Sequence, residues 1–431
     1  MSTATPAGGD RSGRRLLMVA PEYPPATGGM ETHAAETARR LRDRGHRVTV
    51  LTRAGQGPAP DGCVPAEAIL DRRFDRALRA IARRAHEEQA EALLVMNAGY
   101  APTALHPGGP RPPILVRTVG NDAYGAWHGP RLPLRFLFWR LPHARPDSLG
   151  ARLRRRDQDR RVAAALAGLK RCAAILCNSR YTQGRLESLG VERRRLRLLV
   201  GGVDPGAYHP GPEPRRFDAA APVLGTAGRL KPIKGFGTAI EALADLRRRG
   251  VAARLLVAGS GPDEAALRAQ AASPGLDGAV EFLGDLAAER MPDFFRRLDL
   301  YLQPSIEVHH EQSGIVQAES MGRALLEAQA SGVPVVASRT GGIPDVVEDD
   351  RTGRLVPPGD AGALAQAIEI LCGDPGARAR LSEAARRAVV ERFSWDAVVR
   401  ETESEIERAI AAASGGGRRR GPEANRLDLP A

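Results

Sequence analysis

Two runs of short apolar segments that alternate with helical patterns are the feature that most limits how this chain can fold. The first run opens with Leu16–Ala20, which reads as a buried strand, followed by a Pro/Gly-rich loop and a helical pattern over about 30–44. Further strands are predicted at 48–51, 93–97, 114–119, 174–178 and 196–200. Strands that alternate with helices indicate a parallel sheet with both faces covered.

The alternation is interrupted at residues 204–222, a stretch rich in Pro, Gly and Asp that we interpret as a linker. Beyond it, helices are predicted near 236–249, 263–272 and 319–331, and strands at 223–225, 254–257, 279–283, 299–303 and 334–337. Ligands of open parallel sheets bind beyond the carboxyl ends of the strands. We therefore predict an α/β fold of two Rossmann-like domains whose parallel sheets face each other across a cleft.

The length of the chain, 431 residues, is enough for two or three domains. A disordered tail is expected at 1–13, an N-terminal Rossmann-like domain at 14–205 and a C-terminal Rossmann-like domain at 206–393. A C-terminal helix at 394–413 and a disordered tail at 414–431 complete the expected division.

Charge and cysteine content exclude several classes of partner. The net charge of +12 comes mostly from arginine, but no zinc-finger, RRM or basic-zipper pattern accompanies it, so we expect no nucleic acid binding. The four cysteines form no C-x-x-C pair and no histidine lies at metal-ligand spacing, so no metal site is expected and a reducing cytoplasm fits. Neither a signal peptide nor an apolar run of about 18 residues is present, so we expect a cytoplasmic chain without a membrane span.

Each of two further segments can be interpreted either as a binding site or as ordinary surface structure. Residues 131–140 are apolar and basic and could touch a membrane, but Pro133, with Pro130 just before the segment, and the short length favour a helix or loop on the acceptor side. Asp157-Gln158-Asp159 mimics a metal-binding D-x-D, but it lies in an Arg-rich run and is interpreted as a charged helix face.

Glycine pairs and basic residues follow the predicted strands where a ligand would bind. Gly28 and Gly29 stand between a strand and a helix and would let backbone N–H groups approach an anion, although a tight turn without a ligand is an equal possibility. Arg229 and Lys234 follow the first strand of the second domain, where they could neutralise a diphosphate or form a solvated basic loop. Gly261 enters the next helix and permits close approach of backbone or ligand.

The segment Glu319–Ala328 carries the strongest signal. If Glu319 precedes a helix and Glu327 lies two turns inside it, both carboxylates can point into one cleft and accept hydrogen bonds from sugar and ribose hydroxyls. Gly322 would expose helix N-terminal amides to phosphate. The alternative is an amphipathic helix with two surface glutamates, which the spacing alone favours.

In their order and strand-end placement, these segments resemble family 4 of the retaining glycosyltransferases, which have the twin-Rossmann GT-B architecture. The resemblance covers about 16–400 and includes Gly332–Ala337, leading to Gly341-Gly342, and Thr352–Asp360. It implies that Arg229 and Lys234 neutralise the diphosphate of a nucleotide-sugar donor, while Glu319 holds the donor sugar. The other implied donor-binding residues are Gly28, Gly29, Gly261, Leu283 (through main chain near the base), Gly322, Arg323 and Glu327 (at the ribose). No cofactor and no essential metal are expected.

The sequence also departs from the family pattern. Val119 stands where many relatives have a histidine, so Asn121 and Asp122 are the expected acceptor residues. Gln317 followed by Glu319–Gly322 resembles the subgroup that glycosylates aminocyclitols such as 2-deoxystreptamine in antibiotic pathways.

We therefore predict transfer of a hexose, GlcNAc or glucose, from UDP to a hydroxyl of a small acceptor, with membrane contact not expected. The alternatives are a lipid-linked or inositol acceptor, a nucleotide-sugar 2-epimerase on the same fold, or an inactive nucleotide-sugar-binding protein.

Overall fold

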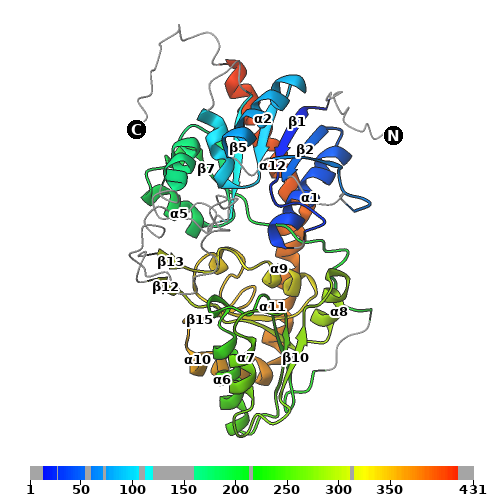
Figure 1. The fold of residues 1–431 in the computed structure, drawn as a ribbon. Helices are drawn as coiled ribbons and strands as arrows, with labels where there is room; N and C mark the ends of the chain where they lie inside the picture. The colour runs from blue at the N-terminus through cyan, green and yellow to red at the C-terminus, as the bar shows by residue number, and fades with distance from the viewer. Residues whose placement is uncertain are drawn as a thin grey trace, which may run out of the picture.

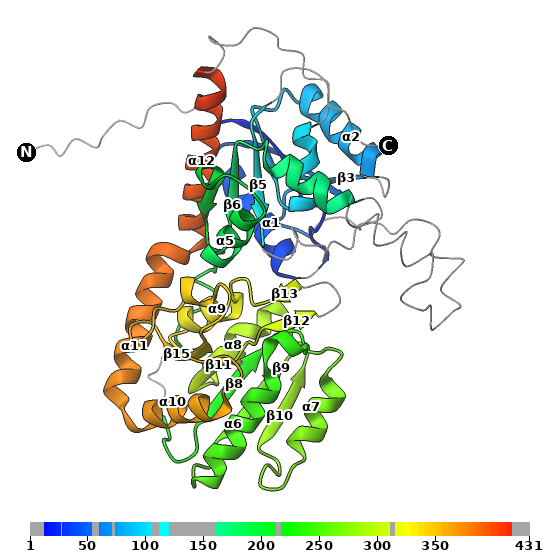
Figure 2. The same cartoon turned by 90° about the vertical axis from the view of Figure 1, so that its left-hand side faces the viewer.

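The computed structural model describes residues 13–26, 28–53, 60–70, 74–105, 112–119, 160–212, 217–310 and 315–415. Most of the two predicted tails, 1–12 and 416–431, lies outside the described residues, as do segments 131–140 and 157–159. Figures 1 and 2 show two α/β lobes, one above the other, which are joined near the middle of the chain and again near its end.

The first lobe contains a parallel sheet with the strand order β3-β2-β1-β4-β5-β6-β7. Its strands are β1 (Arg15–Val19), β2 (Arg47–Arg53), β3 (Ala66–Leu70), β4 (Ala92–Val95), β5 (Ile114–Thr118), β6 (Ala174–Cys177) and β7 (Leu196–Leu198). Successive residues of a strand point to opposite faces, so Leu16 and Met18 join one buried cluster while Leu17 and Val19 join another. Each face therefore needs its own layer of helices.

The second lobe repeats this arrangement with the parallel order β10-β9-β8-β11-β14-β15. Its strands are β8 (Val223–Ala227), β9 (Arg254–Ala258), β10 (Val280–Gly284), β11 (Leu300–Gln303), β14 (Val335–Ser338) and β15 (Arg354–Val356). A short antiparallel hairpin, β12 (Val308–His310) with β13 (Ile315–Gln317), follows β11. The predicted fold of two Rossmann-like domains with parallel sheets is confirmed.

Helices cover both faces of each sheet (Figures 1 and 2). Those of the first lobe are α1 (Gly29–Asp43), α2 (Phe74–Glu87), η1 (Ala98–Leu105), a helical segment at 160–169 and α5 (Arg180–Ser188), with the short turn η3 (Arg193–Arg195). Those of the second are α6 (Phe236–Arg248), α7 (Glu264–Ala271), α8 (Met291–Arg296), α9 (Arg323–Ala330), α10 (Ala361–Gly373) and α11 (Pro375–Ala388). Three short turns, η4 (Pro232–Lys234), η5 (Ala288–Arg290) and η6 (Ile343–Asp345), and the π-helical η7 (Val389–Phe393) complete this lobe.

The last helix, α12 (Trp395–Gly415), leaves the second lobe and packs against the first (Figure 2). Its residues Trp395, Val398, Val399 and Ile406 belong to the same buried cluster as Leu16 and Met18 of β1. Helix α12 therefore contributes to the hydrophobic core of the first lobe.

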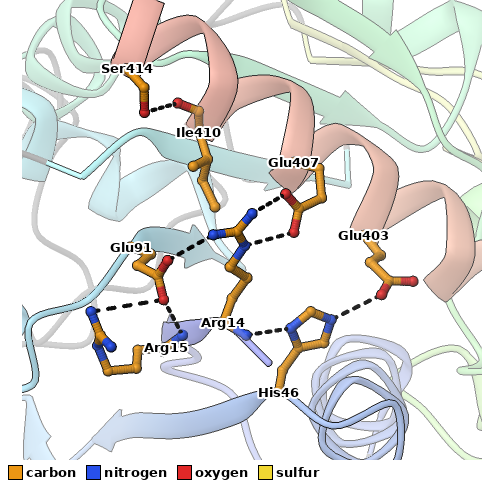
Figure 3. Close-up of polar contacts among 8 residues, drawn as sticks. All are labelled: Arg14, Arg15, His46, Glu91, Glu403, Glu407, Ile410 and Ser414. Atoms are coloured by element: carbon orange, nitrogen blue, oxygen red, sulfur yellow. Dashed lines mark hydrogen bonds and ion pairs between the residues drawn. The ribbon is translucent and has the colours of Figure 1, made fainter. Parts of the chain in front are cut away.

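Ion pairs along the same helix fix this contact (Figure 3). Arg14 donates two hydrogen bonds to Glu407, at 2.9 and 2.8 Å, and a third to Glu91 at 3.0 Å. The His46 ring lies 3.0 Å from the Glu403 carboxylate. Burial alone would raise the pKa of Glu403, but hydrogen bonds from Arg44 and His46 outweigh it and lower that pKa.

None of the helices in the described part of the chain is long and apolar enough to cross a membrane.

Candidate active site

The carboxyl ends of the two sheets face each other, because loops that follow strands of both lobes are in direct contact. Asn178, which follows β6, donates a hydrogen bond to the Ser320 hydroxyl at 3.1 Å. At the start of α5, Arg180 donates its backbone N–H and its guanidinium to Asp345, at 2.6 and 2.8 Å. Loops from several strand ends of each lobe are thereby gathered in the space between the sheets.

Lys234 and Glu319 form an ion pair at this place, with 2.5 Å between Nζ and Oε2. The loop after β8 brings the lysine there through η4 and a left-handed Gly235, with φ 66°. A Cβ on Gly235 would lie 1.8 Å from the Pro304 carbonyl oxygen, so only glycine allows this close approach to the loop after β11. Arg229, on the same loop, is exposed and forms no ion pair with the described residues.

Glu319 is held in place by the glycine pair that follows β14. The Gly342 N–H donates to the Glu319 carbonyl oxygen at 2.8 Å. A Cβ on Gly341, whose φ is 54°, would lie 2.0 Å from that same oxygen. The strand-end turn predicted at Gly341-Gly342 therefore supports the backbone under Glu319.

Glu327 forms a second pair, in which its Oε1 lies 3.0 Å from Nε of Arg323. Helix α9 begins at Arg323, directly after a left-handed Gly322 with φ 90°, so the two side chains are one helical turn apart on one face. The Glu327 side chain is only 8% exposed and that of Glu319 12%, which rules out the interpretation as two surface glutamates. Burial raises the pKa of Glu327, and the Arg323 guanidinium opposes that rise.

The N-terminus of α1 reaches this second pair from the other lobe. A Cβ on Gly29 would lie 4.0 Å from Nη1 of Arg323. That nitrogen is buried and has no hydrogen-bond partner among the described residues. Gly28, Gly29, Gly322, Arg323 and Glu327 are thus brought together, as the sequence predicts, and the first amides of α1 lie beside a cation with a spare donor.

Gly261 and Leu283 line the same edge of the second sheet but have visible packing roles. A Cβ on Gly261 would lie 2.3 Å from the Leu230 carbonyl oxygen, so this glycine lets the loops after β8 and β9 pack together. Leu283, near the end of β10, is half-buried against the core. The predicted acceptor residues Asn121 and Asp122 lie outside the described residues, whereas Val119 directly follows β5.

Sequence reasoning did not single out the polar groups at the carboxyl edge of the first sheet. Glu22, Arg53 and Asn97 follow or end three neighbouring strands and are hydrogen-bonded to one another. Their position at strand ends was the one feature of the sequence that could have indicated them as site residues. Asn178 and Ser179, between β6 and α5, have the same kind of position.

No group of three or more His, Cys, Asp or Glu side chains within the described residues is arranged to hold a metal ion. The cysteines Cys63, Cys172, Cys177 and Cys372 form no disulfide.

Comparison with known proteins matches both lobes to sequence models of glycosyltransferases. Residues 27–207 match "Glycosyltransferase Family 4" and residues 212–388 match "Glycosyl transferases group 1". A D-inositol 3-phosphate glycosyltransferase of Acidothermus cellulolyticus is 30% identical, over 92% of this chain and 91% of its own. The chain belongs to the family 4, group 1 glycosyltransferases. It is an enzyme with a nucleotide-sugar donor and the GT-B fold.

Another relative of this glycosyltransferase is also named for an inositol-containing acceptor. A GDP-mannose-dependent alpha-(1-6)-phosphatidylinositol monomannoside mannosyltransferase of Mycobacterium tuberculosis is 27% identical, over 89% of this chain and 95% of that protein. These relatives do not single out the predicted aminocyclitol subgroup. Their names describe transferases, which favours transfer over the isomerase alternative.

Solved structures agree with the fold. HepE of Anabaena, crystallised with UDP, matches with a TM-score of 0.70 and 19% identity, over 91% of this chain and all of that one. Sucrose-phosphate synthase of Thermosynechococcus elongatus matches with a TM-score of 0.68 and 20% identity, over 93% of this chain and all of that one.

Proposed function

We propose that this glycosyltransferase moves a hexose from a nucleoside diphosphate, with UDP as the first choice, to a hydroxyl of a cyclitol. The observation that carries the proposal is the pair of ion pairs, Lys234–Glu319 and Arg323–Glu327, between the facing sheet edges. Cations there can neutralise a leaving diphosphate, and carboxylates can accept hydrogen bonds from sugar hydroxyls.

The donor site follows from the charges. Negative charge grows on the diphosphate as the glycosidic bond breaks, and Lys234, Arg229 and the spare donor of Arg323 supply positive charge at one edge. Glu319 binds the sugar and Glu327 the ribose in this proposal. Because Arg323 opposes the effect of burial on Glu327, it favours the ionised carboxylate that ribose hydroxyls need. The reaction proceeds without a metal ion.

A cyclitol acceptor unites the evidence from sequence and relatives. The Acidothermus relative is named for an inositol phosphate and the Mycobacterium relative for a phosphatidylinositol mannoside. The Glu319–Gly322 variant resembles enzymes that act on aminocyclitols, which are amino-substituted rings of the same kind. GDP is the alternative nucleotide, since the Mycobacterium relative uses GDP-mannose.

The test begins with thermal unfolding of the enzyme in the presence of UDP-, GDP-, ADP- and TDP-sugars. The donor that stabilises it is then incubated with myo-inositol, inositol 3-phosphate or 2-deoxystreptamine, with EDTA present, and products are identified by mass spectrometry. A glycosylated cyclitol supports the proposal. If the enzyme instead epimerised the donor in the absence of acceptor, the isomerase alternative would replace the proposed transfer. A requirement for added metal would overturn the proposal that the reaction needs no metal ion.

A further inference from the structure

A polar cluster at the carboxyl edge of the first sheet has no role in the donor site described above. It consists of Glu22, Arg53, Asn97 and Tyr100 and is called the edge cluster below. Arg53 is the last residue of β2, Glu22 comes three residues after β1 and Asn97 two residues after β4. Since β2, β1 and β4 are neighbours in a parallel sheet, these side chains meet where such sheets bind ligands.

Hydrogen bonds fix the orientation of the Glu22 carboxylate. Arg53 donates to its Oε1 at 2.9 Å, and the Asn97 amide donates to its Oε2 at 3.3 Å. Asn97 is itself oriented, because its side-chain oxygen accepts the Gly99 N–H at 2.8 Å. Arg53 is in turn hydrogen-bonded to Tyr100, whose side chain is buried.

The edge cluster remains open to ligand, since 23% of the Glu22 side chain and 32% of the Arg53 side chain are exposed. A carboxylate has about four lone-pair positions, so two hydrogen bonds leave Glu22 able to accept others. Arg53 also keeps Nε buried without a hydrogen-bond partner among the described residues, so this guanidinium has a spare donor.

The cluster also lies close to the donor site. The nearby carboxylate of Glu31 contributes to the raised pKa of Glu22, and Glu31 lies on the first turn of α1, the helix that begins at Gly29. Gly29 in turn lies beside Arg323 of the donor site. A ligand on Glu22 would therefore be a neighbour of the donor, on the side of the first lobe.

We propose that Glu22, held by Arg53 and Asn97, binds the acceptor and selects a neutral or amino-bearing cyclitol over a cyclitol phosphate. Hydroxyl and ammonium groups donate hydrogen bonds to a carboxylate, whereas a phosphate brings like charge to it. Arg53 offers little compensation because it already neutralises Glu22. The inference rests on the proposed cyclitol transfer, and it separates this enzyme from its relative named for inositol 3-phosphate.

The experiment measures acceptor binding and turnover in the full-length enzyme. Calorimetric titrations with 2-deoxystreptamine, myo-inositol and inositol 3-phosphate are run on enzyme saturated with the nucleotide found above, and KM and kcat are measured for each acceptor. Glu22→Gln removes the charge at constant shape, and Glu22→Asp keeps the charge. Glu67→Gln is the matched control, because Glu67 also pairs with an arginine, Arg84, but on edge strand β3 against α2.

We expect wild-type enzyme to bind the amino-bearing ring at least about tenfold more tightly than the phosphate, a difference of about 1.4 kcal/mol. Glu22→Gln should raise the KM for the amino-bearing ring at least about tenfold and narrow the discrimination against phosphate, whereas Glu22→Asp should preserve that discrimination. Nucleotide binding should be unchanged in both variants, and the control should behave as wild type.

Preference of the wild type for inositol 3-phosphate, or an unchanged acceptor affinity in Glu22→Gln, would overturn the inference while leaving sugar transfer intact. Absence of transfer to every cyclitol would instead overturn the proposed function. The calorimetric titration keeps the two failures apart, because it reports acceptor binding without turnover.

Discussion

Replacing Lys234 by alanine tests the donor site most directly, because it removes one cation from the ion pair with Glu319. Two unit charges about 4 Å apart interact by about 4 kcal/mol at an effective dielectric constant of about 20. The Lys234 side chain is 24% exposed, so solvent screens part of this interaction with a bound diphosphate. A loss of about 2 to 4 kcal/mol in transition-state stabilisation corresponds to a fall of roughly 30-fold to 900-fold in kcat/KM.

The same substitution leaves the Glu319 carboxylate without its partner in a largely buried position. Removing one member of a buried pair costs several kcal/mol, and we expect about 1 to 3 kcal/mol of unfolding free energy here because both side chains retain some exposure. Adding Glu319→Gln to Lys234→Ala should restore part of that stability, although the double variant stays slow because the sugar contact is also lost.

The assay is initial-rate kinetics with the stabilising donor, alongside urea unfolding of each variant. Lys231→Ala is the matched control, because Lys231 is an exposed lysine on the same loop. It should retain wild-type kinetics within about twofold. If Lys234→Ala also kept wild-type kcat/KM, or if Lys231→Ala lost as much, the assignment of the diphosphate cation to Lys234 would be refuted.

Three other substitutions test separate parts of the structure. The raised pKa of Glu327 means that the folded state holds this proton to higher pH than the unfolded chain, so wild-type stability falls as pH rises through that window. Glu327→Gln should lose this pH dependence of the unfolding free energy, measured by urea titration between about pH 4 and 8, and should slow turnover at least about tenfold. If the unfolding free energies of variant and wild type changed in parallel with pH, the argument from burial would be contradicted. Arg14→Ala should lower the unfolding free energy by only about 1 kcal/mol, since its pair with Glu407 is partly exposed; no change in thermal midpoint would show that apolar packing alone holds α12. Gly341→Ala should cost about 1 to 3 kcal/mol and most of the activity, because its Cβ would collide with the Glu319 carbonyl; unaltered kinetics would disprove that support.

Most strands of the two sheets were predictable from their apolar runs, whereas two strands at the sheet edges were not. The runs at β1, β4, β8 and β9 are mostly apolar, so their place in a buried sheet follows from composition. The edge strands β3 and β15 were missed, because Glu67 interrupts the apolar residues of β3 and β15 is only three residues long, one of them Arg354. They form because each lies beside a strand with free backbone groups, a tertiary influence that a short window cannot show.

Site residues divide in the same manner. Lys234, Glu319, Gly322, Arg323 and Glu327 were predicted from strand-end position and from the resemblance to family 4, and the structure gathers them at one place. The edge cluster was not predicted, because Glu22 is 31 residues from Arg53 and 75 residues from Asn97 in sequence, and the three side chains meet only through the order of three strands. Gly261 shows the reverse limit, since its spacing fits a ligand loop but its close neighbour is the Leu230 backbone.

The sequence alone determined that this chain forms two parallel α/β sheets and which loops end at a ligand edge, because hydrophobic periodicity and strand-end glycines are local properties. The tertiary structure decided which side chains meet there. Long-range packing pairs Lys234 with Glu319 and sets Gly29 beside Arg323. It also returns α12 to the core of β1, since a buried apolar face packs against whichever elements the strand order brings near, and these are often distant in sequence.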